Sequence, residues 1–114
     1  MKKLGIVEGF YGSLMSFSQR NAIVESLSNN NLNFYLYAPK EDPFIRKHID
    51  LDHSKEWEDQ FQNFCHNANK KNIQISAGLC PKTNDYVSLA NKINKFKSLG
   101  CNHFAILFDD TEDY

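Results

Sequence analysis

The segment 103–108 ends in five consecutive apolar residues, FAILF, and this run constrains the fold more than any other feature of the chain. A short unbroken apolar run is typical of a strand buried on both faces, and such strands occur in parallel sheets covered by helices. Similar short runs rich in apolar residues occur at 3–7, 33–37 and 73–77. We therefore expect four strands of one parallel sheet.

Three helical patterns separate these runs. Ser16 and Gln19 form a capping-box pattern that predicts a helix over 17–30, and Ser54 is expected to cap a helix that reaches about residue 71. A third helix should begin at Asn84 or Asp85 and end near Leu99, before Gly100. The side chains expected to face inward are Ile23, Val24 and Leu27, then Trp57, Phe61, Phe64, Cys65 and Ala68, then Val87, Ala90, Ile93 and Phe96. This order predicts an α/β fold of parallel βαβ units with right-handed crossovers, as in strands one to four, the first half, of a (β/α)₈ TIM barrel.

Composition excludes several classes of protein. A net charge of -1 gives no reason to expect nucleic acid or a membrane surface as a partner. No stretch approaches the roughly 20 apolar residues of a membrane helix. Cys65, Cys80 and Cys101 show no CxxC spacing, which makes a disulfide framework or a metal site unexpected. We expect reduced core thiols in a cytoplasmic protein.

Polar, charged or glycine residues follow three of the predicted strands where each strand ends. Gly9 and Tyr11 belong to the segment EGFYG after the first strand, Lys40 belongs to APKED after the second, and Asp109 and Asp110 directly follow the fourth. α/β folds place their chemistry at the carboxyl ends of parallel strands. These residues are therefore candidates for one active site.

Each segment also has a plainer structural interpretation, which the residues alone leave open. Gly9 lets a ligand approach the backbone closely, or it belongs to a turn whose glycines have positive φ. Lys40 contacts a ligand, or it is a solvated or ion-paired surface lysine. Asp109 and Asp110 act on a substrate, or they form a helix N-cap and a first-turn acid. The occurrence of all three segments together favours the functional interpretation.

Three segments carry a resemblance to a known family. They are VEGFYG at 7–12, NFYLYAPKEDP at 33–43, and residues 100–110, which end in FAILFDD. In this order and at this spacing they resemble glycoside hydrolase family 84, the β-N-acetylglucosaminidases that include the O-GlcNAcases. The resemblance covers nearly the whole chain. It implies a (β/α)₈ barrel and hydrolysis of terminal N-acetyl-β-glucosaminide bonds.

The resemblance also implies a role for each candidate residue. The family hydrolyses its substrate with retention by substrate-assisted catalysis, in which the 2-acetamido carbonyl of the sugar attacks the anomeric carbon and forms an oxazoline. Asp109 would orient and polarise the acetamido N–H, and Asp110 would protonate the leaving oxygen and then activate water. Gly9 and Lys40 would contact sugar hydroxyls, and Tyr11 would line the sugar pocket. No metal or other cofactor is implied. Repulsion between the adjacent carboxylates raises one of their pKa values, and the sequence leaves open which one.

The resemblance further implies the partners of the protein. The expected substrate is a glycan or glycoprotein that contains N-acetylglucosamine. A barrel typically needs about 250 residues, so residues 1–114 are expected to form an N-terminal half that is inactive without the rest, whether as a fragment, a split gene product or a remnant. The apolar inner sheet face and open edges of such a half allow a complementing C-terminal half-barrel chain as a second partner. The alternative function is a non-catalytic barrel remnant that binds a glycan or a complementing chain.

Overall fold

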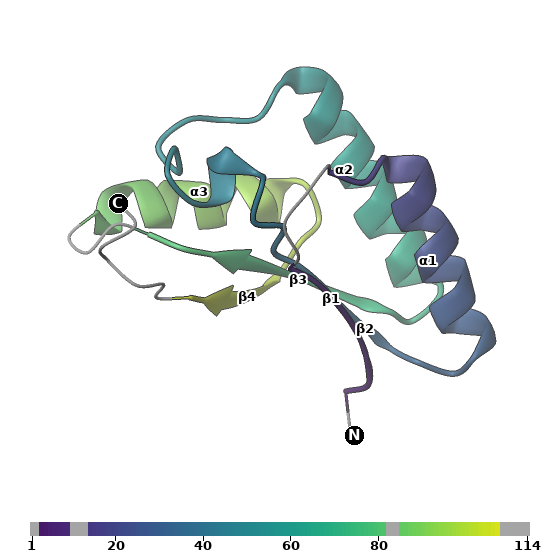
Figure 1. Ribbon diagram of the computed structural model, residues 1–114. Coiled ribbons are helices and arrows are strands. Elements are labelled where there is room, and N and C mark those ends of the chain that lie inside the picture. Colours follow the sequence, from purple (N-terminus) through teal and green to yellow (C-terminus); the bar gives the residue numbers. More distant parts are fainter. Residues whose placement is uncertain (1–2, 10–13, 82–84, 108–114) are drawn as a thin grey trace.

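The structure is a computed structural model that describes residues 3–9, 14–81 and 85–107 (Figure 1). The predicted alternation of strands and helices is confirmed, and the strand boundaries differ from the prediction by at most two residues. In chain order, the elements are β1 (Gly5–Glu8), α1 (Phe17–Asn29), β2 (Phe34–Tyr37), the 3₁₀ helix η1 (Pro43–Ile45), α2 (Lys55–Lys70), β3 (Gln74–Leu79), α3 (Tyr86–Ser98) and β4 (His103–Ile106).

The four strands form one parallel sheet in the order β1-β2-β3-β4, so each strand pairs with the next strand along the chain. Gly5 pairs with Phe34 at the start of β1, and Ala77 pairs with Phe104 between β3 and β4. All three α-helices lie on the same face of the sheet, with α2 and α3 above the strands in Figure 1 and α1 to their right. The fold class is therefore α/β, as predicted.

The helix starts follow from local hydrogen bonds that the sequence predicts. The backbone N–H of Gln19 donates to Ser16 Oγ at 3.1 Å, and the backbone N–H of Ser16 donates to Gln19 Oε1 at 2.8 Å, which completes the capping box. Ser54 caps α2, and α3 is capped by Asp85. Gly100 follows α3 with a φ of 98°, a left-handed conformation that glycine adopts without steric cost.

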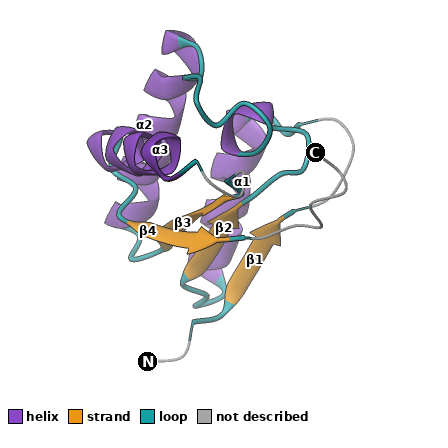
Figure 2. Cartoon of the chain, turned by 90° about the vertical axis from the view of Figure 1, so that its left-hand side faces the viewer, coloured by secondary structure: helices purple, strands orange, loops and turns teal. Residues whose placement is uncertain are grey.

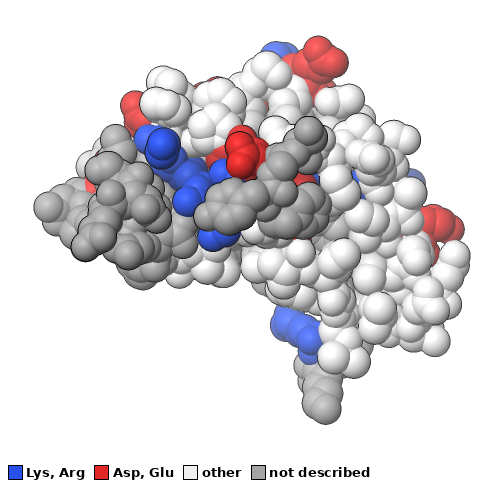
Figure 3. Space-filling view, in the orientation of Figure 1, with Lys and Arg blue, Asp and Glu red and all other residues white. Residues whose placement is uncertain are grey.

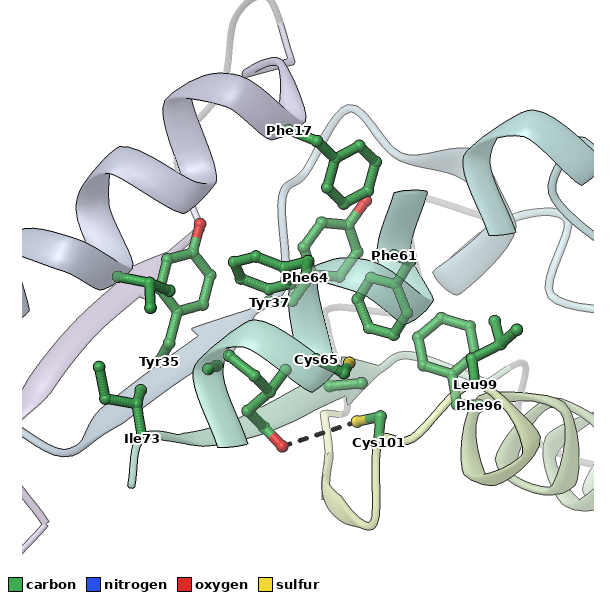
Figure 4. Close-up of a cluster of buried hydrophobic side chains, with 14 of the residues drawn as sticks. Phe17, Tyr35, Tyr37, Phe61, Phe64, Cys65, Ile73, Phe96, Leu99 and Cys101 are labelled. Atoms are coloured by element: carbon green, nitrogen blue, oxygen red, sulfur yellow. Dashed lines mark hydrogen bonds between the residues drawn. The ribbon is translucent and has the colours of Figure 1, made fainter. Parts of the chain in front are cut away.

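Aromatic side chains fill the space between the sheet and the helices (Figure 4). The predicted stripe of α2 is confirmed, since Phe61, Phe64 and Ala68 are fully buried. Phe61 stacks on Trp57 with ring centroids 4.8 Å apart, and Phe64 meets the ring of Tyr35 edge-on at 5.2 Å. This layer is the hydrophobic core of the described part of the chain.

The predicted inward face of α3 is partly wrong. Val87 is 74% exposed and Ala90 is also exposed, whereas Lys92 is only 2% exposed. Lys92 takes an inward position because its Nζ donates a 2.5 Å hydrogen bond to the carbonyl of Leu51, in the loop before α2. Compared with the prediction, α3 is turned about its own axis, so that a different side faces the core. This side consists of Leu89, Lys92, Ile93 and Phe96.

The second face of the sheet has no helix over it in the described part of the chain. By strand alternation and register, this face is apolar over β1 and β2, where Val7 and Leu36 lie. It is polar at the starts of β3 and β4, where Ser76 and His103 lie, and it has no polar side chain further along, where Gly78 pairs with Ala105. The expectation of an apolar inner face therefore holds except at the starts of β3 and β4.

Charged side chains on the side of the molecule seen in Figure 3 are mixed in sign, with basic and acidic groups next to each other. Cys65, Cys80 and Cys101 are all buried and form no disulfide. Among the described residues, no helix combines the length and the apolar character that crossing a membrane requires.

Candidate functional site

The ends of the four strands meet at one edge of the sheet, which we call the C-terminal edge. The backbone N–H of Ala38 donates to the carbonyl of Glu8 at 2.9 Å, which joins the ends of β1 and β2. The backbone N–H of Leu107 donates to the carbonyl of Leu79 at 2.8 Å, which joins the ends of β3 and β4. Residues that directly follow the strands are thereby brought to a common edge.

Gly9 lies at this edge beside Ala38, and it is half-buried. Its φ is not positive, so the alternative of a positive-φ turn is wrong for this glycine. A methyl group at this position would meet Val7 Cγ1 at 3.4 Å and the carbonyl oxygen of Ala38 at 3.7 Å, which are ordinary contacts among the described atoms. The absence of a side chain therefore leaves space next to the backbone, as close approach of a ligand requires.

Lys40 lies at the same edge, in a turn that begins two residues after β2. The backbone N–H of Asp42 donates to the carbonyl of Pro39 at 3.2 Å, which places Lys40 and Glu41 at the two central positions of the turn. The side chain of Lys40 is half-buried. The structure thus brings Gly9 and Lys40 to one edge of the sheet, in the segments that follow the neighbouring strands β1 and β2.

Asp42 ends this turn with a buried carboxylate that accepts three hydrogen bonds. The donors are the hydroxyl of Tyr37 at 2.5 Å, Nε2 of His53 at 2.7 Å and the backbone N–H of Phe44 at 2.9 Å. Burial alone would raise the pKa of the Asp42 carboxyl, but the hydrogen bond and charge of His53, together with the other two donors, hold this pKa below its usual range. The carboxylate is therefore ionised, and it is hydrogen-bonded to three groups of the protein.

A second buried carboxylate belongs to Glu8, directly before Gly9. Arg20 of α1 donates to it from Nη2 at 2.8 Å and from Nε at 3.0 Å, and the hydroxyl of Tyr35 also donates to it. Burial alone would lower the pKa of Arg20, but the hydrogen bond and charge of Glu8 raise it above its usual value. The guanidinium also lies over the ring of Phe17, 4.6 Å from its centroid. This network fixes the end of β1 to α1 and β2.

Sequence reasoning missed the structural roles of Glu8 and Asp42. Both carboxylates occur within the motif segments, and both are turned toward the helices, where they are at most 2% exposed. The one available signal was the pair Tyr35 and Tyr37 at alternate positions of a strand. Buried tyrosine hydroxyls need hydrogen-bond partners, and each of these finds one of the two carboxylates.

The remaining predicted site residues, Tyr11, Asp109 and Asp110, lie outside the described residues, so their roles stay predictions. Leu107 is the last described residue, and it lies at the C-terminal edge two positions before Asp109 in the sequence. Within the described ranges, no group of three or more His, Cys, Asp or Glu side chains is arranged to hold a metal ion.

The described residues also form shallow depressions. One of about 210 Å³ lies beside Asp42, between the segment before α1 and the start of α2, and it is lined mainly by apolar groups of Leu14, Phe44 and Trp57. A polar one of about 270 Å³ lies at the opposite edge of the sheet, next to Asn72. The latter is remote from Gly9 and Lys40, because it adjoins the starts of β3 and β4.

Comparison with known proteins identifies the family. The family model described as beta-N-acetylglucosaminidase matches residues 4–114. Protein O-GlcNAcase of Rattus norvegicus and that of Mus musculus are each 31% identical to this chain over 115 residues. These matches cover 95% of this chain and 13% of each relative.

A solved structure gives the same result. A mutant of the O-GlcNAc hydrolase of Thermobaculum terrenum is 28% identical to this chain and superposes with a TM-score of 0.87. The match covers 96% of this chain and 25% of the hydrolase chain, so the present chain spans about a quarter of the length of that protein. The chain belongs to the β-N-acetylglucosaminidase family of glycoside hydrolases, the O-GlcNAcase family 84.

Proposed function

We propose that residues 1–114 supply strands one to four of a (β/α)₈ barrel that hydrolyses terminal N-acetyl-β-glucosaminide bonds. The sheet order β1-β2-β3-β4, with all three α-helices on one face, carries this proposal. A doubly wound sheet reverses its strand order at a switch point and has helices on both faces. A barrel sheet runs in chain order with helices on the outside only. The TM-score of 0.87 to an O-GlcNAc hydrolase supports the same assignment.

The proposed reaction is substrate-assisted hydrolysis with retention. The carbonyl oxygen of the 2-acetamido group attacks the anomeric carbon and displaces the leaving oxygen, which gives an oxazoline. Asp109 orients the acetamido N–H and stabilises the charge that develops on the oxazoline ring. Asp110 protonates the leaving oxygen and then accepts a proton from the water that opens the oxazoline. Neither step requires a metal or another cofactor.

Sugar binding is assigned to Gly9, Lys40 and Tyr11. The placement of Gly9 and Lys40 at the C-terminal edge supports this assignment, because β4 ends at the same edge just before Asp109. The space beside Gly9 fits a backbone contact to a sugar hydroxyl. Lys40 provides up to three N–H donors on a long stem.

The proposed substrate is a glycan or glycoprotein that carries N-acetylglucosamine. The sheet face without a helix is the proposed contact surface for the second half of the barrel, supplied either by the same protein or by a complementing chain. Three buried cysteines without a disulfide support a cytoplasmic location.

A chimera tests the proposal. Residues 1–114 would replace the matching segment of the Thermobaculum terrenum hydrolase, and turnover of aryl N-acetyl-β-glucosaminides with good and poor leaving groups would be measured. Asp110→Asn should reduce the rate by about 10²–10⁴-fold for poor leaving groups and by less for good ones, because only poor ones need the acid. Asp109→Asn should impair both alike, because it weakens oxazoline formation.

Two results would contradict the proposal. Equal dependence on the leaving group in both variants would refute the division of roles between Asp109 and Asp110. A chimera that folds, as judged by circular dichroism, but shows no turnover would instead favour the non-catalytic remnant.

A further inference from the structure

We propose that Asp42 is a positioning residue for Lys40, and that its buried carboxylate fixes the turn that presents this lysine at the C-terminal edge. The inference rests on the proposed function, because it assumes that Lys40 contacts the sugar. It concerns how this chain holds Lys40 in place, and it assigns no direct substrate contact to Asp42.

The turn that carries Lys40 is fixed at both ends. One residue before the turn, the backbone N–H of Ala38 is bonded to the carbonyl of Glu8, which ties this part of the chain to the end of β1. At the other end, the backbone N–H of Asp42 is bonded to the carbonyl of Pro39, which closes the turn itself. A lysine side chain is long and flexible, so the position of its backbone limits where its ammonium group can reach.

The carboxylate of Asp42 joins three parts of the chain. Its donors come from Tyr37 at the end of β2, from Phe44 in η1 and from His53 just before α2. The side chain of Asp42 is only 2% exposed, so water does not compete for these hydrogen bonds. The loop between β2 and α2 therefore folds back on this one carboxylate.

His53, one of the three donors to Asp42, is itself held in place by aromatic contacts. Its ring stacks on Trp57 of α2, with centroids 3.5 Å apart and an angle of 12° between the planes, and it contacts Phe44 at 4.9 Å. Two residues earlier in the chain, the carbonyl of Leu51 is bonded to buried Lys92 of α3. A shift of the Lys40 turn would have to break the hydrogen bonds of Asp42 to Tyr37 and His53, because strand pairing holds Tyr37 and the stack on Trp57 holds His53.

A double-mutant cycle in the chimera separates positioning from general stabilisation. Lys40→Met should lower kcat/KM by about 10–100-fold, the size expected for loss of a hydrogen bond from a charged group. Asp42→Asn should lower kcat/KM by roughly 10-fold, and the double variant should be no worse than Lys40→Met alone. Glu58→Gln is the matched control, because Glu58 is a nearly buried carboxylate that pairs with Lys95 at 3.2 Å, and its effect should add to that of Lys40→Met. Additive losses for Asp42→Asn and Lys40→Met would overturn the proposal.

A second measurement on the 114-residue chain does not depend on activity. Backbone ¹⁵N relaxation of Lys40 should give an order parameter of about 0.85 in the native chain and below about 0.6 in Asp42→Asn, with no change in Glu58→Gln. His53→Leu, which leaves Asp42 in place and removes one donor, should shift the order parameter in the same direction by less. A low order parameter of Lys40 in the native chain would overturn the proposal, and so would an order parameter that is unchanged in Asp42→Asn and His53→Leu. An inactive chimera with the expected relaxation result would count against the proposed function and leave the fixed turn supported.

Discussion

Replacement of Arg20 by Met tests how strongly the buried ion pair of β1 stabilises the fold. Met preserves much of the apolar stem of Arg20 but removes the donors at 2.8 and 3.0 Å from the Glu8 carboxylate. Both side chains are at most 2% exposed, so water cannot replace the lost donors, and among the described residues Glu8 keeps only the hydroxyl of Tyr35 as a side-chain donor. Breaking a buried pair in this way costs about 3–5 kcal/mol. At about 4 °C per kcal/mol for a domain of this size, the midpoint of thermal unfolding should fall by about 12–20 °C.

The assays are urea unfolding for the free energy and thermal unfolding for the midpoint, each followed by circular dichroism and by the fluorescence of Trp57, the single tryptophan, which stacks on core residues. Glu8→Gln combined with Arg20→Met is the control, because the neutral amide can still accept from Tyr35. This double variant should recover roughly half or more of the lost stability, since no unpaired charge remains buried. Equal destabilisation of the single and double variants would refute the reasoning, because the cost would then not come from the unpaired charge.

Three further predictions concern other sites. Gly9→Ala should raise the KM of the chimera without lowering its unfolding midpoint, and a loss of stability in this variant would contradict the prediction. Gly5→Ala should instead lower the free energy of unfolding by about 3 kcal/mol or more, because its methyl group would lie 1.6 Å from a backbone oxygen of β2. The difference in unfolding free energy between the native chain and Asp42→Asn should be largest at about pH 5 and above, and it should shrink as the pH falls below about 4. The reason is that the lowered pKa of Asp42 in the folded state adds stability only while the carboxylate is ionised; acid unfolding curves of the two proteins that stay parallel would disprove this. Burial raises the pKa of Cys65 well above its usual value and that of Cys101 to about 11, so neither thiol should react with an aromatic disulfide reagent faster than the chain unfolds, as peptide mapping after labelling would show.

The elements that the sequence predicts well are those determined by neighbouring residues. Ser16 and Gln19 cap α1 through bonds that span three positions, and the stripe of α2 from Phe61 to Ala68 follows the helical period. Local hydrogen bonds and amphipathic spacing are both visible in a single segment. The start, the extent and the buried face of these helices could therefore be predicted.

The face of α3 could not be predicted, because a distant loop determines it. Lys92 is a typical surface residue, and its burial is made favourable by the carbonyl of Leu51, 41 residues earlier, and by the charges of Asp52, Asp42 and Glu58. The local pattern instead favoured Val87 and Ala90, which the structure leaves exposed. A helix period identifies an apolar side, but it does not show which polar side chain will find a partner across the fold.

The candidate site also combines features that neighbouring residues determine with features that depend on distant parts of the chain. The prediction that Gly9 and Lys40 lie at one edge of the sheet is correct, because the carboxyl ends of neighbouring parallel strands always meet at the same edge. The orientation of Glu8 and Asp42 toward the helices depends on Arg20 and His53, which lie 12 and 11 residues away. Neither carboxylate is a predicted site residue, and both stabilise the strand ends that carry Gly9 and Lys40.

The strand order has a consequence for how the chain folds. Each strand pairs with its successor, so every pairing closes only one strand–helix unit of chain. Closing a short segment costs less entropy than closing a long one, and folds with local contacts form faster. During synthesis from the N-terminus, β2 can dock on β1 as soon as α1 has emerged, and β3 and β4 can then add in turn. No pairing in the described sheet has to wait for a strand from a distant part of the chain.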